Sequence, residues 1–421
     1  MAESVNIAGN LSARQAASPW SPLREPLFRS LWIAAVISYT GTWMQNVGAG
    51  WLMTQITVSP LMVSLVQAAS TLPVFLVILP AGALADMVDR RRFLLITQGW
   101  MVLASGALGI LTLLHVVTPW VLLGFTFLLG FGAVMNDPAW QAITPEIVSH
   151  QRHAPAVALN SVGFNVARAI GPALGGAVIA AAGSGIAFLL NAASFFGVIF
   201  FLYHWKRQSY EHVETGRVRD AMIAGLRYVS TAPVVKCVLI RTAAFSIGAS
   251  SLLALLPIIA RRHGATGYGF LLTSFGLGAL AGAAVLPRLR TRLSVDGLVA
   301  FAIVTFAAMT FAAGQVQTFG WLILVLFASG TAWIGILACL NVAAQTMSPP
   351  HLRARALSMY LLVLQGGMAL GSAAWGALAT KVGIANAMLY SALALVAGLI
   401  SVKKYRLTSE ELQLAPAMVR D

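Results

Sequence analysis

Long apolar stretches alternate with short polar ones along almost the whole chain. A helix needs about 20 apolar residues to cross the hydrocarbon core of a bilayer, and a window of about 19 residues finds such stretches. We predict twelve of them, near residues 29–53, 60–84, 93–115, 119–140, 155–182, 186–204, 237–260, 266–287, 296–314, 318–347, 354–380 and 383–402. The pattern therefore predicts an all-α membrane protein with twelve transmembrane helices.

One longer polar stretch, residues 205–236, separates six predicted spans from six. Within it, Val218, Met222, Leu226 and Val229 share one helical face, which indicates a short amphipathic helix lying on the membrane surface. The predicted units are a cytoplasmic N-terminal segment (1–28), an N-terminal six-helix bundle (29–204), the linker (205–236), a C-terminal six-helix bundle (237–402) and a cytoplasmic tail (403–421).

Composition agrees with this class, since 58% of the 421 residues are hydrophobic and only 10% are charged, against roughly 25% charged in soluble proteins. The first 27 residues contain no apolar core, so we expect no cleavable signal peptide. The two cysteines, Cys237 and Cys339, offer neither a disulfide framework nor a CxxC metal site. We expect no metal and no cofactor.

The basic residues indicate the orientation of the chain. Cytoplasmic loops carry an excess of Lys and Arg, and with the N-terminus inside, almost all of the 27 basic residues fall on or near cytoplasmic segments. The exceptions are Arg168, Arg261, Arg262 and Lys381. We expect a multi-pass protein of the inner or plasma membrane with both termini cytoplasmic. The net charge of +14 is then a topology signal, and because it is scattered over short loops it does not indicate nucleic-acid binding.

The two halves of the chain resemble each other, as internal repeats of transporters do. The glycines of "NVARAIGPALGGAVIAAAG" recur at matching places in the second half: Gly171, Gly176 and Gly183 align with Gly371, Gly376 and Gly383. Asn165 aligns with Gln365, and Asp137 of "DPAWQ" aligns with Asn341 of "NVAAQ". This repeat predicts two pseudo-symmetric bundles.

A charged loop between the second and third spans carries a family motif. Gly82, Leu84, Asp86, Arg90 and Arg91 match the pattern G-x-L-x-D-x-x-x-R-[RK] that the major facilitator superfamily has at this place. The segments "GTWMQNVGAGWLM", "LPAGALADMVDRRR", "NDPAWQAITPEIV" and "NVARAIGPALGG" resemble the branch that contains the enterobactin exporter and macrolide efflux proteins, the transmembrane secretion effector family. Met87 and Asp89 depart from the commonest form of the motif.

The resemblance implies a secondary transporter with the major facilitator fold, whose central cavity opens alternately to either side. It implies export of a small amphipathic molecule, siderophore-like or drug-like, by an antiporter that uses protons. We expect a monomer that contacts membrane lipid and is not an enzyme. The sequence has no nucleotide-binding loop, no HExxH and no GxSxG. An uptake symporter, a lipid-handling facilitator or scramblase, and a non-transporting membrane partner remain alternatives.

The charged loop itself has two interpretations. Its arginines could simply anchor the loop in the cytoplasm. The acid Asp86 does not help such anchoring, and the resemblance implies that it sits against the N-terminal end of the eleventh helix, near Arg353, where free backbone N–H groups attract an anion. Arg90 would then pair with Asp137. In this second interpretation the loop is a latch that closes the cytoplasmic side.

Arg168 is predicted about 18 Å into the fifth span, if that span starts near residue 156. An intramembrane charge marks a functional site by default, but Arg168 could instead brace carbonyls that are freed where the helix is broken by proline. Both roles stay open. The neighbouring small residues and proline resemble the fifth-helix motif of antiporters, Gly171, Pro172, Gly175 and Gly176.

Further polar or aromatic candidates for the cavity wall are Gln45, Asn46, Asn165, Trp333 and Gln365. A single membrane amide more often forms an interhelical hydrogen bond, but repeat-related positions such as Asn165 and Gln365 meet near the central axis. No carboxylate lies in the middle of a span, so the cavity favours a neutral or anionic substrate. The deepest acid, Asp137, is the candidate for proton coupling, through a pair with Arg90 that protonation would break.

Overall fold

The computed structural model describes residues 18–87, 89–205, 233–346, 348 and 352–404, all in helices or short connections. The long helices are α2 (Pro26–Ile56), α3 (Pro60–Met87), α4 (Arg90–Leu113), α5 (Pro119–Ile147), α6 (His153–His204), α8 (Pro233–Ile259), α9 (Gly264–Arg290), α10 (Val295–Gln315), α11 (Phe319–Thr346), α12 (Arg353–Val382) and α13 (Ile384–Lys404). Three short 3₁₀ helices are η1 (Ser21–Arg24), η2 (His150–Arg152) and η3 (Ala260–His263). The all-helical class is confirmed.

Glycine separates the two helical stretches that run together in α6. Gly183 has φ 82° and ψ 166°, so the helix is broken between the predicted spans 155–182 and 186–204. Gly383, the residue that the repeat aligns with Gly183, separates α12 from α13 with φ 83° and ψ 162°. Because residues other than glycine rarely adopt this conformation, two aligned glycines with the same backbone geometry support the repeat.

Eight helical stretches of the described residues are long and apolar enough to cross a membrane. Two of them, residues 150–204 and 235–290, contain 55 and 56 residues. As one straight helix, each would be about 80 Å long at 1.5 Å per residue, more than twice the thickness of a hydrocarbon core. Each also contains a glycine of positive φ, Gly183 or Gly264. Each of the two is therefore long enough for more than one crossing.

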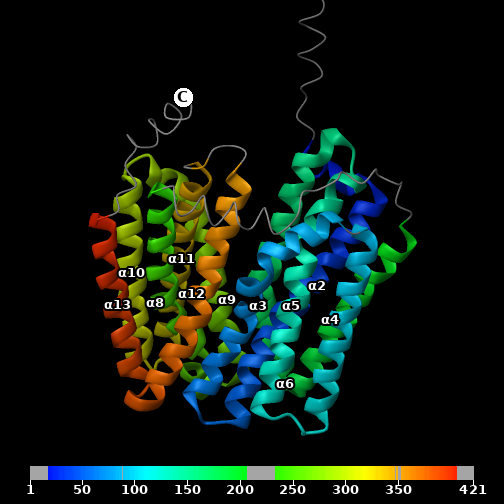
Figure 1. The fold of residues 1–421 in the computed structure, drawn as a ribbon. Coiled ribbons are helices and arrows are strands. Elements are labelled where there is room, and N and C mark those ends of the chain that lie inside the picture. Colours follow the sequence, from blue (N-terminus) through cyan, green and yellow to red (C-terminus); the bar gives the residue numbers. More distant parts are fainter. Residues whose placement is uncertain (1–17, 88, 206–232, 347, 349–351, 405–421) are drawn as a thin grey trace, which may run out of the picture.

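The helices gather in two groups, α2 to α6 on one side and α8 to α13 on the other (Figure 1). Within the first group α6 packs on α2 and α4, and α3 packs on α5; within the second, α9 packs on α11 and α8 on α12. The groups meet where α3 contacts α12 and where α6 contacts α9. Most of the predicted linker, residues 206–232, lies outside the described residues, as do 1–17 and 405–421.

We name the two ends of the bundle by residues that lie there. The Arg90 end holds the end of α3 and α5 and the start of α4 and α6; the His115 end holds the connections α2–α3 and α4–α5. Helix α4 begins cleanly at the Arg90 end because the side chain of Asp89 accepts a hydrogen bond from the Arg92 backbone N–H at 2.8 Å. Asp89, a departure from the family motif, thus acts as an N-cap.

Glycines let α6 approach its neighbours very closely. A Cβ atom on Gly175 would lie 2.8 Å from Met44 Cα of α2, and one on Gly176 would lie 2.6 Å from the Ala265 carbonyl oxygen of α9. Gly269 of α9 faces the same crossing and would overlap the Pro172 carbonyl oxygen if it had a side chain. The predicted fifth-helix motif therefore joins α6 to both helix groups, toward the His115 end.

We expect Gly176→Ala to lower the unfolding free energy by about 1–3 kcal/mol, the usual cost of adding a methyl group where the core has no space. The matched control is Gly124→Ala in α5, because nothing lies within 4 Å of a Cβ atom there. Thermal unfolding of the purified proteins measures both. Equal melting temperatures for the two variants would contradict the close approach.

Candidate functional site

A cavity of about 420 Å³ lies between the two helix groups. We call it the central cavity. It is lined by residues of α2, α3, α5 and α6 from the first group and of α8, α9, α11 and α12 from the second. Four of the predicted candidates line it: Asn46, Arg168, Trp333 and Gln365. The structure therefore brings together, in one cavity, residues from both halves of the chain that were predicted separately.

Arg168 is the one charged side chain among the described residues that line the central cavity. Its guanidinium carbon lies 6.0 Å from the ring centroid of Trp43, a separation at which a cation is attracted by an aromatic face. Within the described part of the chain it forms no ion pair and donates no hydrogen bond to a carbonyl. The bracing role therefore has no contact here to support it.

Trp333 is part of the apolar core of the second helix group as well as of the cavity wall. It is 7% exposed and packs against the rings of Phe245, Phe275 and Phe306 at centroid distances of 5.4, 5.9 and 5.8 Å. Trp43, which the sequence analysis missed, is half-buried and faces the cavity from α2. In the sequence, Trp43 follows a threonine within a long apolar run. Nothing in that pattern indicates whether the side chain lines a cavity or packs in the core.

Gln45 does not line the cavity. It is 5% exposed and belongs to a buried polar cluster, in which Ser105 Oγ donates to its Oε1 at 2.5 Å and Asn191 Nδ2 also donates to that oxygen. These residues come from α2, α4 and α6. Gln45 and Asn46 are adjacent in one helix, so their side chains point about 100° apart, and only Asn46 can face the cavity.

A second cavity of about 480 Å³ lies within the first helix group, between α2, α5 and α6. We call it the Asp137 cavity. Its polar residues are Tyr39, Asp137, Gln141, Thr144, Asn160, Ser161 and Asn165. Asn165, which was predicted for the substrate cavity, lies here instead, and its side-chain amide donates to the Ser161 carbonyl at 2.8 Å. Asp137 is exposed and forms no ion pair with any described residue.

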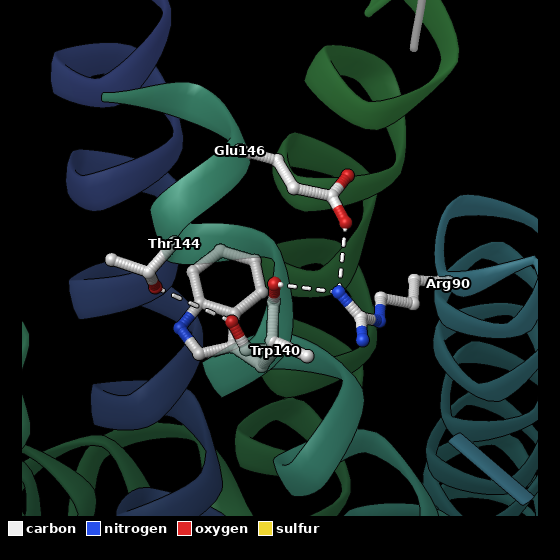
Figure 2. A network of polar contacts seen from close by, with 5 residues as sticks. Arg90, Trp140, Thr144 and Glu146 are labelled. Atoms are coloured by element: carbon white, nitrogen blue, oxygen red, sulfur yellow. Dashed lines mark hydrogen bonds and ion pairs between the residues drawn. The ribbon is translucent and has the colours of Figure 1, made fainter. Parts of the chain in front are cut away.

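The predicted pair between Arg90 and Asp137 is wrong in this structure. Arg90 Nη1 lies 2.9 Å from Glu146 Oε1 and 3.3 Å from the Ala142 carbonyl oxygen (Figure 2). Glu146 is at the end of α5, level with the start of α4, whereas Asp137 is nine residues earlier in α5, about 14 Å deeper. The acid at the right depth is therefore Glu146. The pair joins α4 to α5 inside one helix group.

Arg91 has a different role from its neighbour. Its Nε donates to the Leu202 carbonyl at 2.8 Å and its Nη2 donates to the Tyr203 carbonyl at 2.6 Å. These are among the last carbonyls of α6, which have no partner within the helix, so Arg91 caps the end of α6. Gly82 and Asp86 belong to α3, but the side chain of Asp86 lies outside the described residues, as does its predicted contact with the start of α12.

The second helix group has a buried ion pair of its own. Arg241 of α8 is 4% exposed, and its Nη1 lies 2.5 Å from Asp296 Oδ1 at the start of α10. Neither Arg241 nor Asp296 was among the predicted site residues. A signal was present, because Asp296 is the only acid between Asp220 and Glu410. The ion pair of the first group therefore joins α4 to α5, whereas that of the second group joins α8 to α10.

The described side chains give little support for metal binding. No group of three His, Cys, Asp or Glu residues that could hold a metal ion occurs in the described part of the chain. The polar side chains of both cavities are amides, hydroxyls, one carboxylate and one guanidinium. Such groups bind organic molecules by hydrogen bonds and charge.

We expect Arg90→Gln and Glu146→Gln to show a coupling free energy of about 1 kcal/mol in a double-mutant cycle, because the pair is only partly screened by solvent. The control cycle combines Arg90→Gln with Asp137→Asn, and we expect no coupling there. Unfolding free energies of the four purified proteins in mixed micelles give each value. Coupling of Arg90 to Asp137 but not to Glu146 would contradict the assignment.

The comparisons with known proteins agree on one family. The family model of the transmembrane secretion effectors matches residues 17–419. The multidrug efflux pump Tap of Mycolicibacterium fortuitum is 28% identical over 93% of this chain and 99% of its own length. The enterobactin exporter EntS of Escherichia coli is 24% identical over 91% of this chain and 94% of its own length. The staphyloferrin A transporter of Staphylococcus aureus is 27% identical, but over 39% of this chain and 41% of its own.

Solved structures show the same fold at low identity. The nucleoside transporter NupG superposes with a TM-score of 0.72 at 12% identity, covering 91% of this chain and all of NupG. A bacterial homologue of the lysosomal transporter Spinster, inward-facing and unoccupied, superposes with a TM-score of 0.67 at 13% identity, covering 94% of this chain and 98% of that one. Family model, relatives and fold together show that the chain belongs to the transmembrane secretion effector family of major facilitator transporters.

Proposed function

We propose that this chain is a secondary transporter that exports a small amphipathic organic molecule, anionic or neutral, through the central cavity by alternating access. The observation that carries the proposal is the position of Arg168. It is the one charge among the described lining residues of a cavity between two helix groups, and no carboxylate there neutralises it. Burying a charge without a partner costs several kcal/mol, and an anionic substrate would supply that partner.

The rest of the cavity wall suits an amphipathic molecule. Trp43, Phe275 and Trp333 give apolar area, while Asn46 and Gln365 offer amide hydrogen bonds. Ligand sites commonly have this mixture and volumes of roughly 300–1,000 Å³. Siderophore-like or drug-like molecules fit the description. The names of the relatives point to the same two classes, an enterobactin exporter and a multidrug efflux pump.

We propose twelve crossings, in two bundles of six, with the Arg90 end in the cytoplasm of a cell or inner membrane. Arg90, Arg91 and Arg92 lie at that end, as the positive-inside rule requires. The close contacts of Gly176 with α9 and of Gly376 with Ser64 of α3 join the two groups toward the opposite end. This favours a conformation that is closed outside, and export requires these contacts to separate.

To test the function, molecules released into the medium are compared between cells with the intact gene and cells without it, with enterobactin as the first probe. We expect Arg168→Gln to reduce export at least about tenfold, the effect of about 1.4 kcal/mol, and Arg168→Lys to retain much of it because the charge remains. Arg92→Gln, an exposed control, should export normally. Equal export by Arg168→Gln and the wild type would refute the anionic-substrate assignment.

The proposal includes proton coupling at Asp137. Export against a gradient needs a driving force, and an antiporter needs a carboxylate that can take and release a proton. Asp137 is exposed to its cavity and forms no ion pair with a described residue, so a proton can reach it. Protonation at Asp137 cannot act by breaking a pair with Arg90, since Arg90 pairs with Glu146. It acts by removing a negative charge from the path of the substrate.

In proteoliposomes we expect flux to rise with an imposed pH gradient, and Asp137→Asn to abolish this response while Asp137→Glu keeps it. The physical reason is that asparagine cannot titrate whereas glutamate can. Flux of the substrate identified by the export comparison is measured under a pH gradient and, separately, under an imposed voltage. A response to voltage alone that Asp137→Asn leaves unchanged would show that the substrate carries its own charge across without a titrating carboxylate.

A further inference from the structure

Phe164 lies at the boundary between the two cavities. Of the described residues that line the central cavity and of those that line the Asp137 cavity, Phe164 is the one that belongs to both sets. Its side chain is 42% exposed, so much of the ring faces cavity rather than packed protein. On α6 it lies one turn from Asn160, in the Asp137 cavity, and one turn from Arg168, in the central cavity.

The ring of Phe164 is held by two aromatic neighbours of α2. It meets Tyr39 edge-on, with centroids 5.5 Å apart and planes at 81°, and Trp43 at 6.4 Å and 62°. Tyr39 and Trp43 are one turn apart on α2, as Phe164 and Arg168 are on α6. The same Trp43 ring therefore contacts both Phe164 and Arg168.

The backbones behind these rings have no room to move toward each other. A Cβ atom on Gly163 would lie 2.7 Å from Val36 Cγ2, and one on Gly171 would lie 2.6 Å from Trp43 Cβ. Helices α2 and α6 thus touch on both sides of Phe164. A passage past Phe164 can open by rotation of its side chain, which is fast for exposed residues, without separating the two helices.

We propose that Phe164 is a specificity-determining gate that separates the Asp137 cavity from the central cavity. The ring divides a compartment with one carboxylate, Asp137, from a compartment with one guanidinium, Arg168. A molecule that moves between them must displace the ring from Tyr39 and Trp43. The inference rests on the proposed function, in which the central cavity holds the substrate, and it adds that substrates are selected on their way into it.

The gate is tested by thiol accessibility, which needs no knowledge of the substrate. The native thiols are removed by Cys237→Ser and Cys339→Ala, and one cysteine is introduced by Asn46→Cys in the central cavity or Ser161→Cys in the Asp137 cavity. Both positions are exposed. The probe is the anionic reagent sulfonatoethyl methanethiosulfonate, and its reaction rate with each purified protein in detergent is measured.

With Phe164 present we expect the cysteine at position 46 to react more slowly than the one at position 161. Phe164→Ala should accelerate the reaction at position 46 about tenfold, since two aromatic contacts of the closed state are lost, and leave position 161 unchanged. Phe164→Tyr should keep the slow rate. Phe196→Ala is the matched control, because Phe196 belongs to the part of α6 beyond the break at Gly183, is 58% exposed, and lines neither cavity among the described residues.

Two results would overturn the gate: an unchanged rate at position 46 in Phe164→Ala, or equal rates at positions 46 and 161 while Phe164 is present. If Phe164→Ala does not fold, Phe164→Leu removes the ring while keeping an apolar side chain, and the same rates decide. The outcome is independent of transport. Normal export with unchanged labelling would contradict the gate but not the export function. Accelerated labelling without any export would support the gate and contradict the export function.

Discussion

The close approach of α6 to α2 and α9 is the constraint on which the rest of this structure depends. Gly171 and Gly175 bring α6 against α2, and Gly176 brings it against Gly269 of α9. In a bilayer, lipid is as apolar as the side chains, so helices associate through packing at small residues rather than through the hydrophobic effect. Helix α6 of the first group therefore contacts both α2 of its own group and α9 of the other. Phe164 and Arg168 are on this helix and line the cavities.

The arginine side chains have different kinds of partner at different places in the bundle. At the Arg90 end, Arg90 and Arg91 are satisfied by Glu146 and by the carbonyls that end α6. Arg241, deep in the second group, has Asp296. Arg168 has an aromatic face instead of a carboxylate. A cation–π contact is weaker than a charge-assisted hydrogen bond to a carboxylate, so Arg168 keeps its donors available to a ligand.

Sequence reasoning succeeded where one physical rule acts alone. Apolar length predicted the helical stretches. The alignment of Gly183 with Gly383 predicted a repeat, and in the structure both glycines break a helix with the same backbone geometry. It failed where the outcome depends on helix rotation and depth. Gln45 and Asn46 are equally polar neighbours, but only one faces the cavity. Asp137 and Glu146 are both acids of α5, and the partner of Arg90 is decided by which one is level with it.

The separation of the two cavities explains how one carboxylate and one guanidinium can both stay available to a ligand. Opposite charges in one compartment would pair with each other and leave nothing for a substrate, because an ion pair in a poorly solvated site is strong. Here Asp137 and Arg168 line different cavities, with Phe164 between them. In the proposed gate, the ring of Phe164 keeps the carboxylate from neutralising the guanidinium. The apolar residues of this chain thus determine which of its charges can meet, and through that the chemistry that is open to a ligand.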